Sequence, residues 1–389
     1  MKKSILFLIH TLGGGGAEKV LINIVNNIDK NLYDVTLMTV VDTGVFKKDI
    51  GPDVTYKTMI PLPSSKQKVN DSGSLLKKKS NMSGHLIKLY TAFWKYVPTK
   101  WIYKIFVREK YDVEVAFLEG ICAKIIASST NPKSQKIAWI HVDLMNQHKS
   151  GNIFKSHTEE EKIYDKFNNI ICVSEYVKNQ FQKMFKVHGD VLVKYNPVNV
   201  NEILTKSEEE ALEKPVKRKF TVCSVGRLNA QKAYGRLLEC HKKLIDEGFD
   251  YDLWIVGEGT DRNNLSAYIE NNGLQDSVKL LGFKNNPYVY MRNSDLFVCS
   301  SIAEGFSTVA TEALILGLPI VTTNCSGMQE LLGDSEYGLI TANDTQALYE
   351  GMKAMLRDPE LYAKYREKAK IRGQMFSMEK AINEIQNLF

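Results

Sequence analysis

The sequence predicts two consecutive α/β domains, each built on a doubly wound parallel sheet. Strand-like apolar runs alternate with helix-like segments along the whole chain, a pattern typical of parallel sheets with crossover helices. A chain of 389 residues is also too long for one hydrophobic core. A polar, charge-dense stretch at 199–219 separates two alternating series, so we expect two domains joined there.

The first domain is expected to span residues 1–198 on the acceptor side of the protein. Its predicted strands are 4–9, 34–41, 112–118, 136–140 and 169–173, and a helix is predicted at 17–28. We also expect the carboxyl-terminal helix, 374–389, to pack back onto this domain.

The second domain is expected to span residues 199–373. Its predicted strands are 220–225, 252–256, 278–281, 295–299 and 319–323, and three helices are predicted after Asp344. Ligands of such sheets bind at the carboxyl ends of the strands. We therefore expect the ligand site in a cleft where the two domains face each other.

The composition indicates a globular protein of the cytoplasm. Apolar residues make up 44% and charged residues 25% of the chain, and no run approaches the ~18 apolar residues that cross a bilayer. The six cysteines are scattered without a C-x-x-C pair, which favours buried, reduced thiols over disulfides or a zinc site. The first apolar run is too short for a signal peptide, His10 ends it, and no small-x-small cleavage site follows.

The net charge of +6 is concentrated in one segment. Residues 64–108 contain ten Lys or Arg and one acidic residue, Asp71, whereas the rest of the chain carries 41 basic and 44 acidic residues. This distribution argues against nucleic-acid binding over the whole surface, and no nucleic-acid partner is expected.

The same segment combines its cations with a helical pattern of apolar residues. Apolar side chains recur at spacings of four, three and four, at Leu86, Tyr90, Phe93 and Val97. Seven aromatic residues lie within 90–106 without one acid. The pattern is typical of a helix in a membrane interface, so an anionic membrane surface is expected to bind 77–108. The alternative is a pair of amphipathic helices that cover the first sheet and expose their lysines.

Four glycines, Gly13 to Gly16, separate the first predicted strand from the first predicted helix. One interpretation is a dinucleotide fingerprint, but Asp42 is a weak match to the acidic residue that should bind the ribose. The other is a loop whose backbone approaches a ligand held mainly by other residues, because glycines leave room for close contact.

Two cations follow the first strand of the second domain. Arg227 lies at the carboxyl end of that strand, and Lys232 lies near the start of a helix expected from about Ala230. Fixed cations beside a helix N-terminus suit a diphosphate, although either residue alone would pass for an ordinary surface residue.

A second candidate loop lies at 300–319. Gly305 permits a sharp turn there, and Ser307 is the expected N-cap of the following helix. Glu304 lies in the loop and Glu312 about one turn inside the helix, where both carboxylates accept hydrogen bonds from hydroxyls. The backbone amides of the first helical turn have no partner within the helix and are available to bind an anion. Hydroxyl groups together with an anion describe a nucleotide sugar.

Three motifs of the second domain together resemble retaining glycosyltransferase family 4. They are Gly226-Arg227 followed by Lys232, then Ile255-Val-Gly-Glu-Gly259, and then Glu304 separated by seven residues from Glu312. The resemblance covers essentially the whole second domain and, more loosely, the glycine run and His141. It implies the GT-B fold, in which two Rossmann-like domains face each other across a cleft.

The resemblance also implies roles for individual residues. Arg227 and Lys232 are expected to hold the donor diphosphate. Glu304 contacts the donor sugar, and Glu312 contacts the ribose hydroxyls. The backbone that lines the sugar and phosphate is that of Gly305, Phe306, Ser307, Thr308 and Val309.

The family pattern also bears on four further positions. Gly15 and Gly16 are expected to approach the donor from the first domain, and His141 to lie beside the donor sugar and the acceptor. Ala233 is a departure, because the family usually has a glycine directly after the lysine.

The implied reaction moves a sugar from a nucleoside diphosphate sugar, with UDP favoured, to a hydroxyl of a glycan or lipid-linked glycan. The anomeric configuration is retained, as in bacterial surface-polysaccharide (capsule) biosynthesis at the inner face of the membrane. No metal cofactor is expected, because the D-x-D at Asp250 and Asp252 starts a strand at the edge away from the expected site.

Two alternatives stay open at this point. A nucleotide-sugar epimerase or hydrolase of the same fold would act without an acceptor. A membrane-docking scaffold would need no catalytic residues. An NAD oxidoreductase is disfavoured, since Gly257-Glu-Gly259 lacks the third glycine and does not open its domain.

Overall fold

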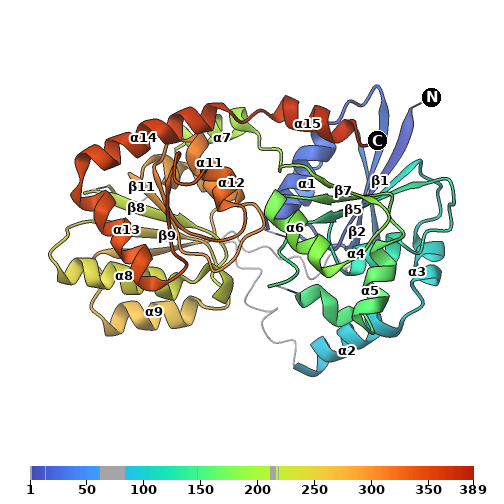
Figure 1. Ribbon diagram of the computed structural model, residues 1–389, viewed down its shortest axis with the longest axis horizontal. Coiled ribbons are helices and arrows are strands. Elements are labelled where there is room, and N and C mark those ends of the chain that lie inside the picture. The colour runs from blue at the N-terminus through green and yellow to red at the C-terminus, as the bar shows by residue number, and fades with distance from the viewer. Residues whose placement is uncertain (1, 14, 62–83, 147, 211–215, 218) are drawn as a thin grey trace. The chain divides into compact units, whose positions relative to one another are not determined.

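The chain forms two compact α/β units, as the computed structural model shows for residues 2–13, 15–61, 84–146, 148–210, 216–217 and 219–389 (Figure 1). The first unit comprises the described residues up to Pro197 together with Glu379–Phe389, and the second comprises Val198–Met378. Among the described residues, no helix combines the length and apolar character that spanning a membrane requires.

The first unit contains a seven-stranded parallel sheet in the order β3-β2-β1-β4-β5-β6-β7. The strands are β1 Lys3–Ile9, β2 Tyr33–Val41, β3 Val54–Ile60, β4 Val113–Ala116, β5 Gln135–Ile140, β6 Asn169–Cys172 and β7 Asp190–Val193. The chain order reverses between β1 and β4, and this switch point is where ligands of doubly wound sheets bind.

Helices cover both faces of this sheet (Figure 1). They are α1 Gly16–Asn27, α2 Gly84–Tyr96, α3 Thr99–Phe106, α4 Ile121–Ile126, α5 His157–Tyr164, α6 Glu175–Met184 and α15 Met378–Gln386. Serines cap two of them: Ser156 accepts from the amide of Glu159, and Ser174 from that of Val177.

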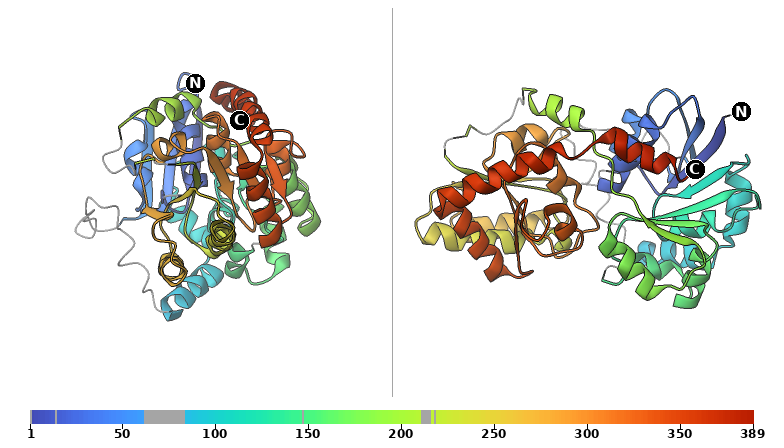
Figure 2. Two further views of the ribbon diagram at one scale, coloured as in Figure 1. Left: turned by 90° about the vertical axis from the view of Figure 1, so that its left-hand side faces the viewer. Right: turned by 45° about the horizontal axis from the view of Figure 1, so that its top comes forward.

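The carboxyl-terminal segment ends beside the first strands of the chain (Figure 2), and specific side-chain contacts attach it to the first unit. The side-chain oxygen of Gln386 in α15 accepts a hydrogen bond from the amide of Asp29 at 2.7 Å. Gln135 donates to the carbonyl of Leu388 at 2.8 Å, and the ring of Phe389 meets that of Phe7 edge-on. Amide pairing and aromatic burial therefore explain why this segment belongs to the first unit.

α2 and α3 divide the aromatic residues of the basic segment between two faces. Trp94 and Tyr103 are buried, and the hydroxyl of Tyr90 lies 2.6 Å from Nε2 of His10. The large apolar side chains that face outward are Leu89, Phe93, Tyr96, Trp101 and Ile105. Of the expected stripe, Phe93 is exposed while Tyr90 and Val97 are half-buried; the side chain of Leu86 and residues 77–79 lie outside the described part.

The second unit contains a six-stranded parallel sheet in the order β10-β9-β8-β11-β12-β13. Its strands are β8 Thr221–Val225, β9 Asp252–Val256, β10 Val278–Gly282, β11 Leu296–Cys299, β12 Ile320–Thr323 and β13 Leu339–Thr341. Its helices are α7 Val200–Ser207, α8 Tyr234–Asp246, α9 Arg262–Asn271, α10 Tyr288–Arg292, α11 Thr308–Ile315, α12 Met328–Leu332, α13 Thr345–Arg357 and α14 Pro359–Gln374.

The strands that the sequence does not predict all lie at sheet edges. They are β3 and β7 in the first sheet and β13 in the second. Their residues are mostly partly or fully exposed, whereas central β1 and β8 are almost wholly buried. An edge strand half-exposed to water carries a weaker apolar signal, so sequence periodicity misses it.

Candidate functional site

The candidate site of the second unit lies at the carboxyl ends of β8 and β11. These strands are neighbours at the centre of the sheet, and the strand order reverses between them. The loop after β8 carries Arg227 and Lys232, and the loop after β11 carries Glu304. The fold therefore brings together two loops that are about 70 residues apart in the sequence.

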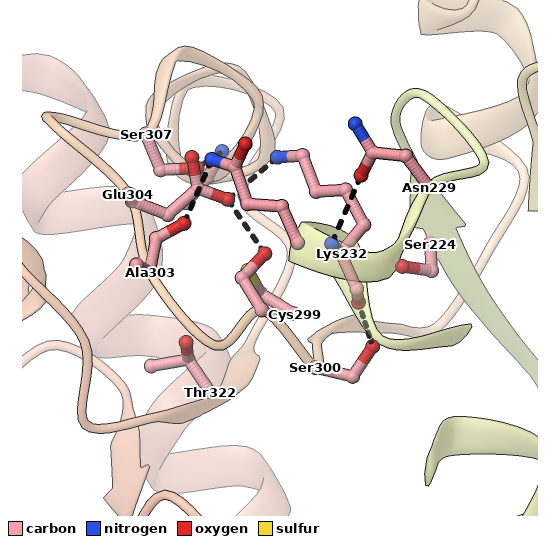
Figure 3. Close-up of polar contacts among 12 residues, drawn as sticks. Ser224, Asn229, Lys232, Cys299, Ser300, Ala303, Glu304, Ser307 and Thr322 are labelled. Atoms are coloured by element: carbon pink, nitrogen blue, oxygen red, sulfur yellow. Dashed lines mark hydrogen bonds and ion pairs between the residues drawn. The ribbon is translucent and has the colours of Figure 1, made fainter. Parts of the chain in front are cut away.

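Lys232 and Glu304 form a short ion pair (Figure 3). Nζ of Lys232 lies 2.6 Å from Oε1 of Glu304, and the side chains are only 17% and 10% exposed. The hydroxyl of Ser301 donates to the same oxygen at 2.6 Å. Burial is the largest single effect and lowers the pKa of Lys232. The charge and hydrogen bond of Glu304, together with neighbouring groups at Cys299 and Tyr234, outweigh burial and raise that pKa above its ordinary value. Lys232 is therefore a protonated lysine whose side chain is largely buried beside its carboxylate partner.

Further hydrogen bonds join the two loops on either side of this pair (Figure 3). The hydroxyl of Ser300 donates to the carbonyl of Lys232 at 2.8 Å, and the side chain of Gln231 donates to the carbonyl of Ala303 at 2.9 Å. Within the loop after β8, the side-chain oxygen of Asn229 accepts a hydrogen bond from the amide of Lys232 at 3.2 Å. Sequence reasoning does not single out these polar residues; only Asn229 carries a local signal, as an asparagine that precedes a helical turn.

The helix after Lys232 begins later than the sequence predicts. Ala230–Lys232 forms one 3₁₀ turn, and α8 starts at Tyr234. Ala233, between them, has φ 49° and ψ 45°, in the left-handed region. The helix expected near Ala230 therefore starts there only as a 3₁₀ turn, and a left-handed residue separates this turn from α8. The same conformation explains why a glycine would suit this position.

We expect Ala233→Gly to stabilise the protein by about 0.5–1 kcal/mol. Relief of the left-handed strain, ~1–2 kcal/mol, is partly offset by the greater freedom of glycine in the unfolded chain. Urea unfolding measures the difference. The control Ala267→Gly, within α9, should instead destabilise by about 1 kcal/mol, because glycine is a poor helix former. A destabilised Ala233→Gly variant would contradict the explanation.

Two glycines hold the loop of Arg227 against the loop after β9. A Cβ at Gly257 would lie 1.8 Å from the carbonyl oxygen of Gly226, and a Cβ at Gly259 would lie 2.0 Å from that of Leu228. The amide of Gly226 donates to the carbonyl of Val256 at 3.0 Å. Gly257 and Gly259 are thus required because the backbones of the two loops pack closely against each other. Arg227 itself is exposed and has no ion pair with any described residue.

α11 supplies the other end of the candidate site. Ser307 is its N-cap, as expected, and its hydroxyl accepts from the amide of Ala310. Glu312 is 9% exposed and accepts a hydrogen bond from the hydroxyl of Tyr288 at 3.1 Å. The two glutamates thus have different partners, although both come from one short segment.

The residues between the two glutamates differ in exposure. Gly305, Phe306 and Ser307 are buried, while Thr308 and Val309 are partly exposed at the first turn of α11. Gly327, with φ 76°, lies against this loop: a Cβ there would be 2.5 Å from the carbonyl oxygen of Gly305. The loop is therefore held by a close backbone contact that the sequence alone does not reveal.

The D-x-D residues lie at the amino end of β9, whereas the candidate site lies at the carboxyl ends of the strands. Asp250 precedes β9 and Asp252 starts it, and Lys219 pairs with both, at 2.6 and 3.5 Å. Within the described residues, His, Cys, Asp and Glu form no group of three or more that could hold a metal ion.

The candidate residues of the first unit follow two strands of its sheet: the glycine run follows β1, and His141 follows β5. Glu119 follows β4, the strand between them. Burial lowers the pKa of His141 to about 3, so the ring is neutral at neutral pH. Its Nε2 is buried and has no hydrogen-bond partner in the part of the chain that is described.

At the described positions of the glycine run, Gly13, Gly15 and Gly16, the backbone conformation does not require glycine. Gly15 has an ordinary φ of −103°, and neither Gly13 nor Gly16 has a positive φ. Gly15 precedes α1 without any side-chain cap. What distinguishes these positions is the absence of a side chain, and the contact of Gly15 and Gly16 with a donor stays a prediction.

Comparison with known proteins shows that this chain is similar to glycosyltransferases. Residues 205–372 match the family model described as glycosyl transferases group 1. The chain is 38% identical over 188 residues to a Campylobacter jejuni protein named N-acetylgalactosamine-N,N'-diacetylbacillosaminyl-diphospho-undecaprenol 4-alpha-N-acetylgalactosaminyltransferase. That match covers 48% of this chain and half of the relative's length. An uncharacterized glycosyltransferase of Haemophilus influenzae is 26% identical, over 99% of both chains.

Solved structures confirm the fold. The crystal structure of Anabaena Alr3699/HepE in complex with UDP-glucose has a TM-score of 0.71 and 20% identity, and covers 99% of this chain and 98% of that one. Together with the two parallel sheets, this likeness confirms the GT-B fold class. The family match and the names of the relatives confirm the resemblance to glycosyltransferases. The roles of Glu304 and Glu312 stay predictions.

Proposed function

We propose, from the match of residues 205–372 to glycosyl transferases group 1, that this protein transfers a sugar from a UDP-sugar to a hydroxyl of a glycan or lipid-linked glycan. The observation that carries the proposal is the buried Lys232–Glu304 pair at the switch point of the second sheet. UDP is favoured because the HepE structure is a complex with UDP-glucose. A lipid-linked acceptor is favoured by the diphospho-undecaprenol in the Campylobacter relative's name.

The ion pair suggests how donor binding begins. A diphosphate that reaches Lys232 competes with Glu304 for the ammonium group, and Arg227 adds a second cation from the neighbouring loop position. Once Lys232 binds phosphate, the carboxylate of Glu304 is free to accept hydrogen bonds from sugar hydroxyls. Glu312, with its support from Tyr288, is assigned to the ribose hydroxyls.

The proposed transfer retains the anomeric configuration. The bond between the sugar and the diphosphate breaks, and the acceptor oxygen bonds to the sugar on the same face. The leaving phosphate takes the acceptor's proton, so no strong base is required. Lys232 and Arg227 stabilise the charge that grows on the diphosphate, in place of a metal ion.

The first unit is assigned to the acceptor. His141 is the residue expected beside the sugar and the acceptor, and its low pKa makes it a neutral hydrogen-bonding group there. The open glycine backbone at Gly15 and Gly16 suits a close approach by a ligand.

A panel of UDP-sugars tests the function. Purified protein is mixed with UDP-glucose, UDP-galactose, UDP-GlcNAc or UDP-GalNAc and with n-octyl glycosides as acceptors, in excess EDTA. We expect acceptor-dependent UDP release and an extended glycoside with the α-linkage of the donor. A changed nucleotide sugar without any acceptor would favour an epimerase instead. Activity only after Mg²⁺ or Mn²⁺ is restored would contradict metal independence.

Glu304→Gln and Glu312→Gln are expected to separate turnover from nucleotide binding. Glu304→Gln should lower turnover at least tenfold, because the proposed partner of Glu304 is the donor sugar. It should not weaken UDP binding, because loss of the carboxylate charge leaves Lys232 free to bind phosphate. Glu312→Gln should weaken UDP binding about tenfold, as loss of a charged hydrogen bond costs ~1.5 kcal/mol or more. Calorimetry with UDP and initial rates measure both. Identical behaviour of the two variants would contradict this division.

We also propose that the outward faces of α2 and α3 bind an anionic membrane surface. Trp101 is 68% exposed and Phe93 is 50% exposed, which places large aromatic groups in water unless a partner covers them. Exposed lysines lie on the same helices, at Lys88, Lys100 and Lys104. Aromatic and basic side chains together suit the interface of an anionic bilayer.

Vesicle sedimentation tests this surface. Protein should bind vesicles of phosphatidylglycerol and phosphatidylcholine at low salt, and less at high salt. Changing Lys88, Lys100 and Lys104 to Gln should lower binding at least tenfold, at ~1 kcal/mol for each cation. The matched control changes Lys133, Lys183 and Lys186, exposed lysines of the same unit, and should bind like the unmodified protein. Equal loss in both triple variants would show only general charge attraction.

A further inference from the structure

Glu119 is a carboxylate at the edge of the first sheet that the roles above leave unused. It follows β4, which lies between β1 with the glycine run and β5 with His141. The strand order of this sheet reverses between β1 and β4, and ligands of doubly wound sheets bind at that point. Glu119 thus lies where this fold places a ligand.

The backbone around Glu119 holds the side chain in one place. Its Oε2 accepts a hydrogen bond from the amide of His141 at 3.2 Å. The next residue, Gly120, has φ 78°, and a Cβ there would lie 3.0 Å from the Cβ of Ser150. A sharp turn that favours glycine therefore leads from Glu119 into α4 and fixes the carboxylate at the strand end.

Two other glutamates of this unit each bond one carboxylate oxygen to side chains, while Oε2 of Glu114 and Oε1 of Glu160 are buried without a hydrogen-bond partner among the described residues. Glu114, on β4 and fully buried, accepts from Tyr103 at 2.7 Å and from Ser129 at 3.1 Å. Glu160 is 1% exposed and bonded to His148 at 2.7 Å. Glu119 differs because it is partly exposed, and its bond to an amide uses one of about four lone-pair sites of a carboxylate.

Two other glutamates of the first unit act electrostatically on Glu119. Burial raises the pKa of Glu119, and the charges of Glu18 and Glu160 raise it further. Glu18 lies in the first turn of α1, and a Cβ on Gly13 would be 3.5 Å from its carboxylate. An anionic group brought to this edge would be repelled, whereas a hydroxyl would donate a hydrogen bond to a carboxylate.

We propose that Glu119 binds a hydroxyl of the acceptor, and that the acceptor presents an uncharged sugar ring to this edge rather than a phosphate or carboxylate. The inference rests on the proposed sugar transfer and adds a residue and a substrate class to it. His141, whose amide holds Glu119, links the new residue to the expected acceptor side.

Glu119→Gln is the informative variant because the amide keeps a carbonyl oxygen for the His141 N–H but loses the negative charge. We expect kcat/KM for the acceptor to fall at least tenfold, with UDP binding and acceptor-free UDP release within twofold of the unmodified protein. The matched control Glu114→Gln removes a carboxylate from the same strand and should leave acceptor kinetics within twofold. If Glu119→Gln leaves the acceptor kinetics unchanged and Glu119→Ala only destabilises the protein, the proposal is wrong. The role of Glu119 would then be structural, as the hydrogen-bond acceptor of the His141 amide.

A binding measurement tests the substrate class without turnover. Saturation-transfer NMR is recorded with n-octyl β-D-glucoside and n-octyl β-D-glucuronide, which differ in one carboxylate. The unmodified protein should bind the glucoside at least tenfold more tightly, and Glu119→Gln should reduce this preference. Equal binding of both glycosides by the unmodified protein would overturn the proposal. A third outcome is that the unmodified protein binds the glucoside more tightly than the glucuronide and yet transfers no sugar in any assay. That result would contradict the proposed function but would leave the binding role of Glu119 standing.

Discussion

Lys232→Met is expected to lower sugar transfer at least tenfold and to destabilise the protein by about 3 kcal/mol. Activity falls because a desolvated cation that binds phosphate is lost, a contact of ~1.5–3 kcal/mol. Stability falls because Glu304, only 10% exposed, loses the ammonium group at 2.6 Å that compensates for its burial. Removing one partner of a buried ion pair typically costs ~3–5 kcal/mol. Urea unfolding and UDP calorimetry measure the two effects separately.

The double variant Lys232→Met, Glu304→Gln distinguishes the two causes. It should regain most of the lost stability, since no unpaired charge remains buried, but none of the lost activity. Lys242→Met is the control: Lys242 pairs with Asp246, which is 57% exposed and one turn away on α8, so its loss should cost less than about 1 kcal/mol. Strictly additive stability losses in the double variant, or an unchanged affinity for UDP in Lys232→Met, would contradict the site.

Gly257→Ala is expected to destabilise the protein by several kcal/mol. The residue has φ 148°, and its added Cβ would lie 1.8 Å from the carbonyl oxygen of Gly226, a backbone atom that cannot turn away as a side chain can. The loop of Arg227 must shift to make room, so the folded fraction should also bind UDP more weakly. Urea unfolding followed by UDP calorimetry checks both parts of the expectation.

Gly273→Ala is the matched control for this clash. Gly273 also has a positive φ, 65°, but no atom lies within 4 Å of the added Cβ. Gly273→Ala should therefore lower the free energy of unfolding only by the left-handed strain of ~1–2 kcal/mol and should leave UDP binding unchanged. Similar losses in the two variants would show that backbone conformation, and not the contact with Gly226, requires glycine at 257.

The pairing inside the site could not be predicted from the chain. The sequence places Lys232 and Glu304 at the ends of strands, but 72 residues separate them, and no local pattern shows that β8 and β11 are neighbours. The left-handed Ala233 is equally hidden, because alanine normally continues a helix. Both features depend on which strands hydrogen-bond to each other.

The sequence by itself determined the α/β class, the central strands and the loops that carry the candidate residues. It could do so because buried parallel strands are continuous apolar runs, and because glycine, serine and charged residues at their carboxyl ends have local conformational and chemical meaning. Only the tertiary structure decided the edge strands, the ion pair of Lys232, and the backbone contacts of Gly257 and Gly327. These depend on residues distant in sequence that meet through strand order, and strand order is set by the packing of the whole sheet rather than by any local pattern.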